Sequence, residues 1–150
     1  MAERPMVLIL SNDELFRDLL AERLRQDHLA VCEAGNLDEV SEQTAAHAPK
    51  TIVIDALTDS SLAAGLLDDP WRTLPDHQPP LLLLTSSSTP VDLCEHPYVD
   101  RAVAVPLASD ALVAAVNYCI AGRARRAMKS GITMRAAVAE TFRTKRSSLG

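Results

Sequence analysis

Three short, uninterrupted apolar runs constrain the fold of this chain more than any other feature: MVLIL at 6–10, TIVIDA at 51–56 and LLLLT at 81–85. Runs of this length without polar alternation are typical of strands buried on both faces. A segment with helical spacing follows the first run, with apolar positions at Leu15, Phe16, Leu19, Leu20 and Leu24. Because parallel strands need crossover connections that pack on the faces of the sheet, this alternation predicts an α/β protein with a parallel sheet.

Two further strands complete the predicted sheet. They lie at 28–34 and at 102–105, and Pro106 ends the second. Between them we expect a helix over about 36–48, because Asn36 can cap it and Glu39 stands three residues later. The sequence therefore predicts five strands.

The second half of the chain has weaker helical signals. A helix is predicted over about 60–67, and an amphipathic helix over about 109–126. Between Pro90 and Pro97 there is room for about one helical turn, at 91–95. The helix that precedes the fifth strand is therefore expected to be short or missing.

Composition restricts the class of protein. With 47% hydrophobic and 23% charged residues in 150, the chain reads as one ordinary globular domain rather than a disordered or low-complexity protein. No apolar run approaches the ~18 residues of a membrane span. The start, MAERPMVLIL, lacks the pattern of a signal peptide. We expect a cytoplasmic protein with no membrane partner.

Candidate metal ligands and nucleophiles are scattered. The cysteines form no CxxC pair, so we expect neither disulfides nor a zinc site but buried small hydrophobes: Cys32, Cys94 and Cys119. The four histidines have no helical i, i+4 spacing. Neither a glycine-rich nucleotide loop nor a GxSxG elbow occurs. We therefore predict no metal, no cofactor and no enzymatic activity.

The net charge of −5 conceals two oppositely charged parts. Residues 1–120 carry seven Lys/Arg and nineteen Asp/Glu, which is −12, whereas residues 121–150 carry eight Lys/Arg and one Glu, which is +7. We divide the chain into a domain at 1–127 and a basic tail at 128–150. Thr133 can cap a short helix in the tail, with Met134, Val138, Thr141 and Phe142 on one side.

The predicted strands end at Ser11 and Asn12, Asp55, Thr85, and Val105 before Pro106, and of these residues Val105 alone is apolar. Four patterns occur in this order: VLILSND opening a helix that contains LFRDLL, then TIVID, then LLLLT thirty residues after the aspartate of TIVID, and an amphipathic last helix. With these patterns the chain resembles the receiver domain of two-component response regulators. The resemblance covers about residues 5–127. It implies a flavodoxin-like (βα)5 fold with the strand order 2-1-3-4-5.

The resemblance also implies a phosphorylation pocket, which is filled only in part. Asp55 stands at the position of the phosphoacceptor, and Thr85 at the position of a hydroxyl residue. Ser11 and Asn12 replace the acidic pair that holds Mg²⁺ in the family. An alignment shifted by one residue would place Asn12 and Asp13 there instead, leaving one carboxylate.

The family's lysine is also replaced, by Val105. A phosphoryl group brings about −1.5 to −2 of charge, and its transfer depends on nearby cations. We therefore interpret the chain as a pseudo-receiver, with Asp55 a vestigial phosphoacceptor in a degenerate pocket. The predicted function is a phosphorylation-independent signalling or transcription-regulatory interaction module.

Two alternatives stay open. The chain could be a working receiver phosphorylated on Asp55 in a phosphorelay, or a nucleic-acid-associated regulator that uses its basic tail, although the acidic body disfavours the second. As partner we expect another regulatory protein or a second copy in a homodimer. The face near Val91, Leu93, Tyr98 and Val99 would serve for this. Residues of the tail that could also make such contacts are Arg123, Arg125, Arg126, Lys129, Phe142, Arg143, Lys145 and Arg146.

Overall fold

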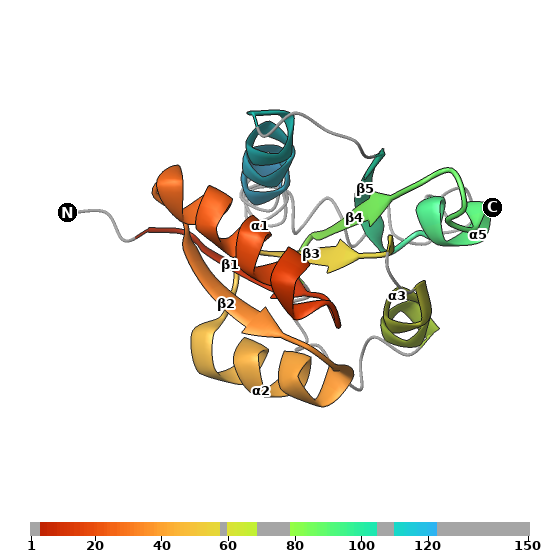
Figure 1. The fold of residues 1–150 in the computed structure, drawn as a ribbon, viewed down its shortest axis with the longest axis horizontal. Coiled ribbons are helices and arrows are strands. Elements are labelled where there is room, and N and C mark those ends of the chain that lie inside the picture. Colours follow the sequence, from red (N-terminus) through yellow and green to blue (C-terminus); the bar gives the residue numbers. More distant parts are fainter. Residues whose placement is uncertain (1–3, 58–59, 69–78, 105–109, 123–150) are drawn as a thin grey trace, which may run out of the picture.

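The computed structural model describes residues 4–57, 60–68, 79–104 and 110–122. Within these ranges, five strands form one parallel sheet in the order β2-β1-β3-β4-β5 (Figure 1). The strands are β1 (Met6–Leu10), β2 (Ala30–Ala34), β3 (Thr51–Asp55), β4 (Leu81–Thr85) and β5 (Val99–Ala104). The predicted fold class, parallel pairing and strand order are confirmed.

Helices cover both faces of the sheet. On one face lie α1 (Glu14–Gln26) and a helix over 110–122, and on the other lie α2 (Leu37–His47) and α3 (Ser60–Asp68) (Figure 1). The segment before β5 holds the single short turn α5 (Val91–Cys94). The fourth helix of the predicted fold is therefore short, as the prolines around it indicate.

Side chains of the preceding loops begin the first two helices. Asp13 Oδ1 accepts a hydrogen bond from the backbone N–H of Phe16 at 3.1 Å, and Asn36 Oδ1 accepts one from Glu39 N–H at 2.9 Å. The Glu39 carboxylate in turn accepts from Gly35 N–H at 2.6 Å. These bonds satisfy N–H groups that have no partner inside the helices.

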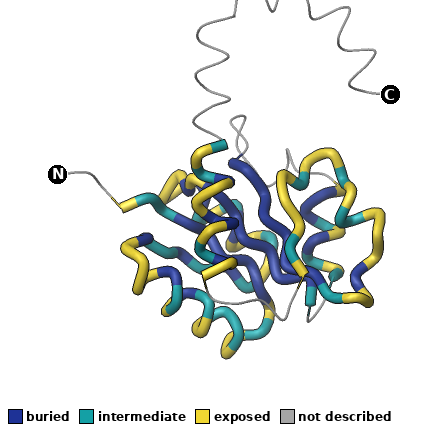
Figure 2. Tube along the Cα trace, turned by 90° about the horizontal axis from the view of Figure 1, so that it is seen from above, coloured by how far each residue is buried: buried dark blue, intermediate teal, exposed yellow. Residues whose placement is uncertain are grey.

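The core consists of two apolar layers, one on each side of the sheet. The central strands β3 and β4 are buried along their whole length, as is β1 apart from its first residue. The edge strand β5 is exposed or half-buried throughout. Figure 2 shows the buried strands in the middle of the molecule and exposed helical turns around them.

Some predicted boundaries were wrong, and two of the residues expected on an exposed face are half-buried. β2 begins at Ala30 rather than at residue 28, because His28 adopts a left-handed backbone with φ 65° and closes the turn after α1. β5 begins at Val99, three residues before the predicted start. Leu93 and Val99, expected on an exposed face, are half-buried and pack against the core, whereas Val91 and Tyr98 are exposed.

Candidate functional site

Three residues with hydroxyl or carboxyl side chains lie at the carboxyl edge of the sheet. Ser11 follows β1, Asp55 ends β3 and Thr85 ends β4, and these three strands are adjacent in the sheet. All three residues are buried, with exposed fractions of 0%, 1% and 6%. Parallel strands bring their carboxyl ends to one edge, which is why residues so distant in sequence lie together.

The Ser11 hydroxyl donates a hydrogen bond to Asp55 Oδ2 at 2.8 Å. The other carboxylate oxygen, Oδ1, accepts from the backbone N–H of Leu57 at 2.8 Å. A buried carboxylate is costly without partners, and hydrogen bonds to a charged acceptor are stronger than neutral ones. Both oxygens of Asp55 are thus engaged by the protein itself.

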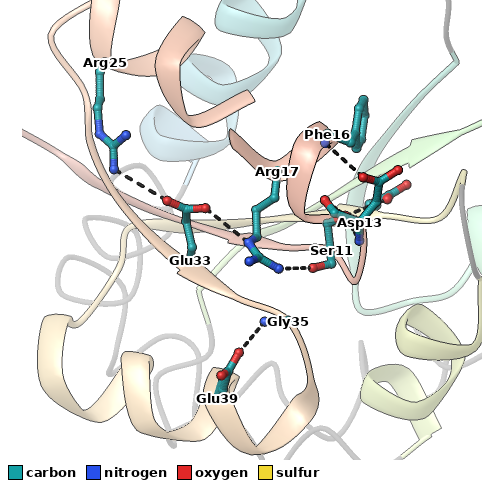
Figure 3. Close-up of polar contacts among 9 residues, drawn as sticks. Ser11, Asp13, Phe16, Arg17, Arg25, Glu33, Gly35 and Glu39 are labelled. Atoms are coloured by element: carbon teal, nitrogen blue, oxygen red, sulfur yellow. Dashed lines mark hydrogen bonds and ion pairs between the residues drawn. The ribbon is translucent and has the colours of Figure 1, made fainter. Parts of the chain in front are cut away.

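Asp13 has a different role from Ser11. Its carboxylate caps α1 through Phe16 N–H, and its own N–H donates to Ser11 Oγ at 3.1 Å (Figure 3). Asn12 between them is exposed. The Ser11 side chain therefore hydrogen-bonds to Asp55, while the Asp13 side chain begins the helix.

An arginine that the sequence analysis did not single out supports the Ser11 backbone. Arg17, on α1, donates from Nη1 to the carbonyl oxygen of Ser11 at 2.7 Å and from Nε to Glu33 Oε1 at 3.1 Å (Figure 3). Glu33 lies on β2 and also pairs with Arg25 at 3.7 Å. Nothing in the sequence distinguishes Arg17 from the other arginines of α1.

Gly35 makes this arrangement fit. A Cβ at Gly35 would lie 3.1 Å from Arg17 Nη1 and 3.3 Å from Glu39 Oε1. Both distances are tighter than ordinary contacts between a Cβ and its neighbours. The absence of a side chain at residue 35 therefore lets the loop after β2 approach the guanidinium that supports Ser11.

The hydroxyl residues after β4 are held by the chain itself. Thr85 Oγ1 donates to the carbonyl of Val103 on β5 at 3.3 Å. Thr89 Oγ1 donates to Ala56 O at 3.3 Å and accepts from Ser86 N–H at 2.9 Å. This loop is closed by its own hydroxyl groups, as expected for a polar turn.

The donor set does not fit the Mg²⁺ site that the receiver resemblance implies. Mg²⁺ in phosphoryl-transfer sites is held through carboxylates and phosphate oxygens. Here Ser11 occupies the place beside Asp55, and the Asp13 carboxylate caps a helix. Across the described ranges, no group of three or more His, Cys, Asp or Glu side chains could hold a metal ion.

Other predicted site residues lie outside the described ranges. Val105 is one of them, and so is every residue of the basic tail. The described helices include none long and apolar enough to cross a membrane. Of the cysteines, Cys32 and Cys119 are buried as expected, but Cys94 is half-buried. Burial raises the pKa of the Cys32 thiol from 9.0 to about 11.

A second surface feature lies between β5 and the helix over 110–122. The Arg101 guanidinium stands 4.9 Å from the centre of the Tyr118 ring, a cation–π distance. Beside this pair is a cavity of about 520 Å³ whose remaining walls are small apolar residues: Val103, Ala104, Ala111, Ala114 and Ala115. Its lining offers one charged group, so it resembles a contact surface rather than a site for chemistry.

No family model matches the sequence, and a search of curated proteins finds no match. Solved structures do match. The receiver domain of a response regulator from Bermanella marisrubri has a TM-score of 0.69 at 15% identity, over 78% of this chain and 98% of that one. A response regulator receiver modulated diguanylate cyclase from Pelobacter carbinolicus has a TM-score of 0.65 at 22% identity. The match covers 82% of this chain and 97% of that one.

A third match is NtrX from Brucella abortus in complex with ADP, with a TM-score of 0.73 at 15% identity. It covers 89% of this chain but 30% of NtrX. At these identities the likeness shows the fold alone. The chain therefore has the receiver fold that its sequence predicted.

Proposed function

We propose that this chain is an atypical receiver that regulates a partner protein by binding it, without phosphorylation of Asp55. The observation that carries the proposal is the buried 2.8 Å hydrogen bond from Ser11 to Asp55. It places a hydroxyl donor, bonded to one carboxylate oxygen of Asp55, where a metal-binding carboxylate would be needed. The receiver fold supports the wider assignment to two-component signalling.

The electrostatics of the pocket support the same conclusion. A phosphoryl group on Asp55 would add about −1.5 to −2 of charge to a buried site. Arg17, the cation that contacts Ser11, is directed instead to a backbone carbonyl and to Glu33. Val105 stands in the sequence where the family has a lysine. The part of the pocket that the structure describes thus has little to neutralise a phosphoryl group, so we expect that phosphate would not shift the conformational equilibrium.

Binding would then be constitutive or induced by the partner. Three large apolar side chains are exposed near the edge strand, Val91, Tyr98 and Tyr118, with exposed fractions of 64%, 38% and 50%. Exposed apolar groups around an edge strand, whose outer backbone groups have no neighbouring strand, favour an interaction surface there. We propose that this face binds either another regulatory protein or a second copy of the chain, in keeping with a non-catalytic role.

Intact-mass spectrometry after incubation with acetyl phosphate and Mg²⁺ tests the proposal. The wild type and Asp55→Asn should both stay unmodified under conditions that load an ordinary receiver. Ser11→Asp/Asn12→Asp/Val105→Lys, which restores the acidic pair and the lysine, should acquire a phosphoryl adduct that Asp55→Asn removes. An adduct on the wild type that depends on Asp55 would overturn the proposal and identify a working phosphorylation switch.

The charge of the tail favours a second candidate function. Residues 121–150 carry a net charge of +7, enough for salt-dependent attraction to nucleic-acid phosphates. The net charge of −12 on residues 1–120 opposes this attraction. A mobility shift with duplex DNA that weakens steeply with salt and disappears in Arg143→Ala/Lys145→Ala/Arg146→Ala would support this function. No shift at low salt would exclude it.

A further inference from the structure

The outer face of α1 exposes two leucines. Leu15 is 70% and Leu19 58% exposed, and they are four residues apart, so they lie one above the other on the helix. The inward-facing Phe16, Leu20 and Leu24 already supply the contacts of α1 with the core. Leu15 and Leu19 are therefore not needed to bury α1, and together they form an unpartnered apolar strip.

Three acidic residues run beside this strip. Glu14, Asp18 and Glu22 are also spaced by four, and all three are exposed. No ion pair within the described part of the chain involves them. The surface thus combines a leucine pair with a row of negative charge, which suits a helix that is apolar on one side and basic beside it.

We infer that this surface, defined by Glu14, Leu15, Asp18, Leu19 and Glu22, is the docking site of the chain's own basic tail. The segment 133–146 has the complementary pattern: Val138 and Phe142 are four residues apart, and Arg135, Arg143 and Arg146 flank them in a helical arrangement. The net charges of +7 for residues 121–150 and −12 for residues 1–120 attract each other. This inference does not depend on the proposed function.

The chain can reach this site from where the described part ends. The helix over 110–122 packs in the same core layer as α1, and Asp110 pairs with Arg23 of α1 at 3.1 Å. Residues 123–132 can span at most about 33 Å when extended. The 13 residues of α1 are about 20 Å long, and a helix over 133–146 would be about 21 Å long. When extended, the connecting residues are thus longer than α1 itself, as the docking of the tail on α1 of the same copy requires.

Paramagnetic broadening in the full chain tests the docking. A nitroxide is attached to the Ser147→Cys variant in a Cys94→Ser background, because Cys32 and Cys119 are buried. The amide signals of Leu15, Asp18 and Leu19 should be lost or strongly broadened. Those of α2, on the other face of the sheet, should remain.

Matched variants separate the two parts of the surface. Leu15→Ser/Leu19→Ser should restore the α1 signals, whereas Val91→Ser, which removes a comparably exposed side chain elsewhere, should not. Asp18→Asn/Glu22→Gln should restore them in part, because the charges are removed and the leucines remain. Glu42→Gln, an exposed acid on α2, serves as the control for charge and should leave the broadening intact.

Two results would overturn the inference. The first is equal broadening over all exposed amides, or none at α1. The second is broadening of α1 in a mixture of isotope-labelled chains without nitroxide and unlabelled chains with it, which would identify a second copy as the occupant.

Discussion

Replacing Ser11 by alanine removes the donor of the buried hydrogen bond to Asp55 and, with it, the hydroxyl that accepts from Asp13 N–H at 3.1 Å. Ser11 is 0% and Asp55 1% exposed, and their atoms are 2.8 Å apart, so water cannot easily take over the bond. A hydrogen bond to a charged group contributes about 1.5–3 kcal/mol to stability. We expect Ser11→Ala to lower the free energy of unfolding by about 2 kcal/mol.

Urea unfolding measures this value directly. The midpoint should fall while the m-value stays the same, because the variant buries the same surface. In a thermal scan the loss corresponds to about 4–8 °C for a domain of this size. Ser88→Ala, which removes an exposed serine hydroxyl, is the matched control and should change the free energy of unfolding by less than about 0.5 kcal/mol.

A double-mutant cycle with Asp55→Ala assigns the loss to the pair. We expect a coupling energy of about 1–2 kcal/mol between positions 11 and 55, because contacting residues are not additive. Additive effects of the two substitutions, or a Ser11→Ala change no larger than that of Ser88→Ala, would refute the reasoning. In that case the Ser11–Asp55 hydrogen bond would be present in the structure but would contribute nothing measurable to the free energy of unfolding.

Three further predictions concern stability and reactivity. Arg17→Met should lower the free energy of unfolding by about 1–2 kcal/mol, because it removes the bonds to Ser11 O and Glu33. Arg25→Met removes a longer and more exposed ion pair, and in the same urea assay it should lower the free energy of unfolding by less than about 0.5 kcal/mol. Cys32 should react with iodoacetamide at pH 8 far more slowly than Cys94, and equal reactivity of the two thiols would contradict this prediction. The raised pKa of Cys32 favours the protonated thiol in the folded state. The contribution of Cys32 to stability is therefore present below pH 9.0 and is lost as the pH rises through about 11. Leu83→Ala, at a fully buried position of β4, should cost about 2–5 kcal/mol, and a smaller loss would mean that the core relaxes around the cavity.

The apolar runs were sufficient to predict the three inner strands of the sheet. MVLIL, TIVID and LLLLT became β1, β3 and β4, because strands covered on both faces have no solvent side on which polar residues could alternate. The edge strand was harder to predict. β5 is exposed or half-buried throughout, so its sequence, VDRAVA, has no such run, and its predicted start was three residues too late.

The candidate site was predictable in position but not in its bonds. Residues at the carboxyl ends of adjacent parallel strands must lie close together, which places Asp55 near Ser11 and Thr85 once the strands and their order are known. Which atoms then pair depends on side-chain rotamers and loop conformations. The sequence alone could not decide whether Ser11 or Asp13 would turn toward Asp55.

By itself, the sequence determined the parallel α/β fold, the strand order through its likeness to receivers, and the set of residues gathered at one edge of the sheet. Only the tertiary structure decided that Ser11 donates to Asp55, that Asp13 caps α1, and that Arg17 supports the Ser11 backbone. The physical reason is that hydrophobic burial depends on a periodicity that can be read along the chain. Hydrogen bonds depend on distances of about 3 Å between residues that are far apart in it.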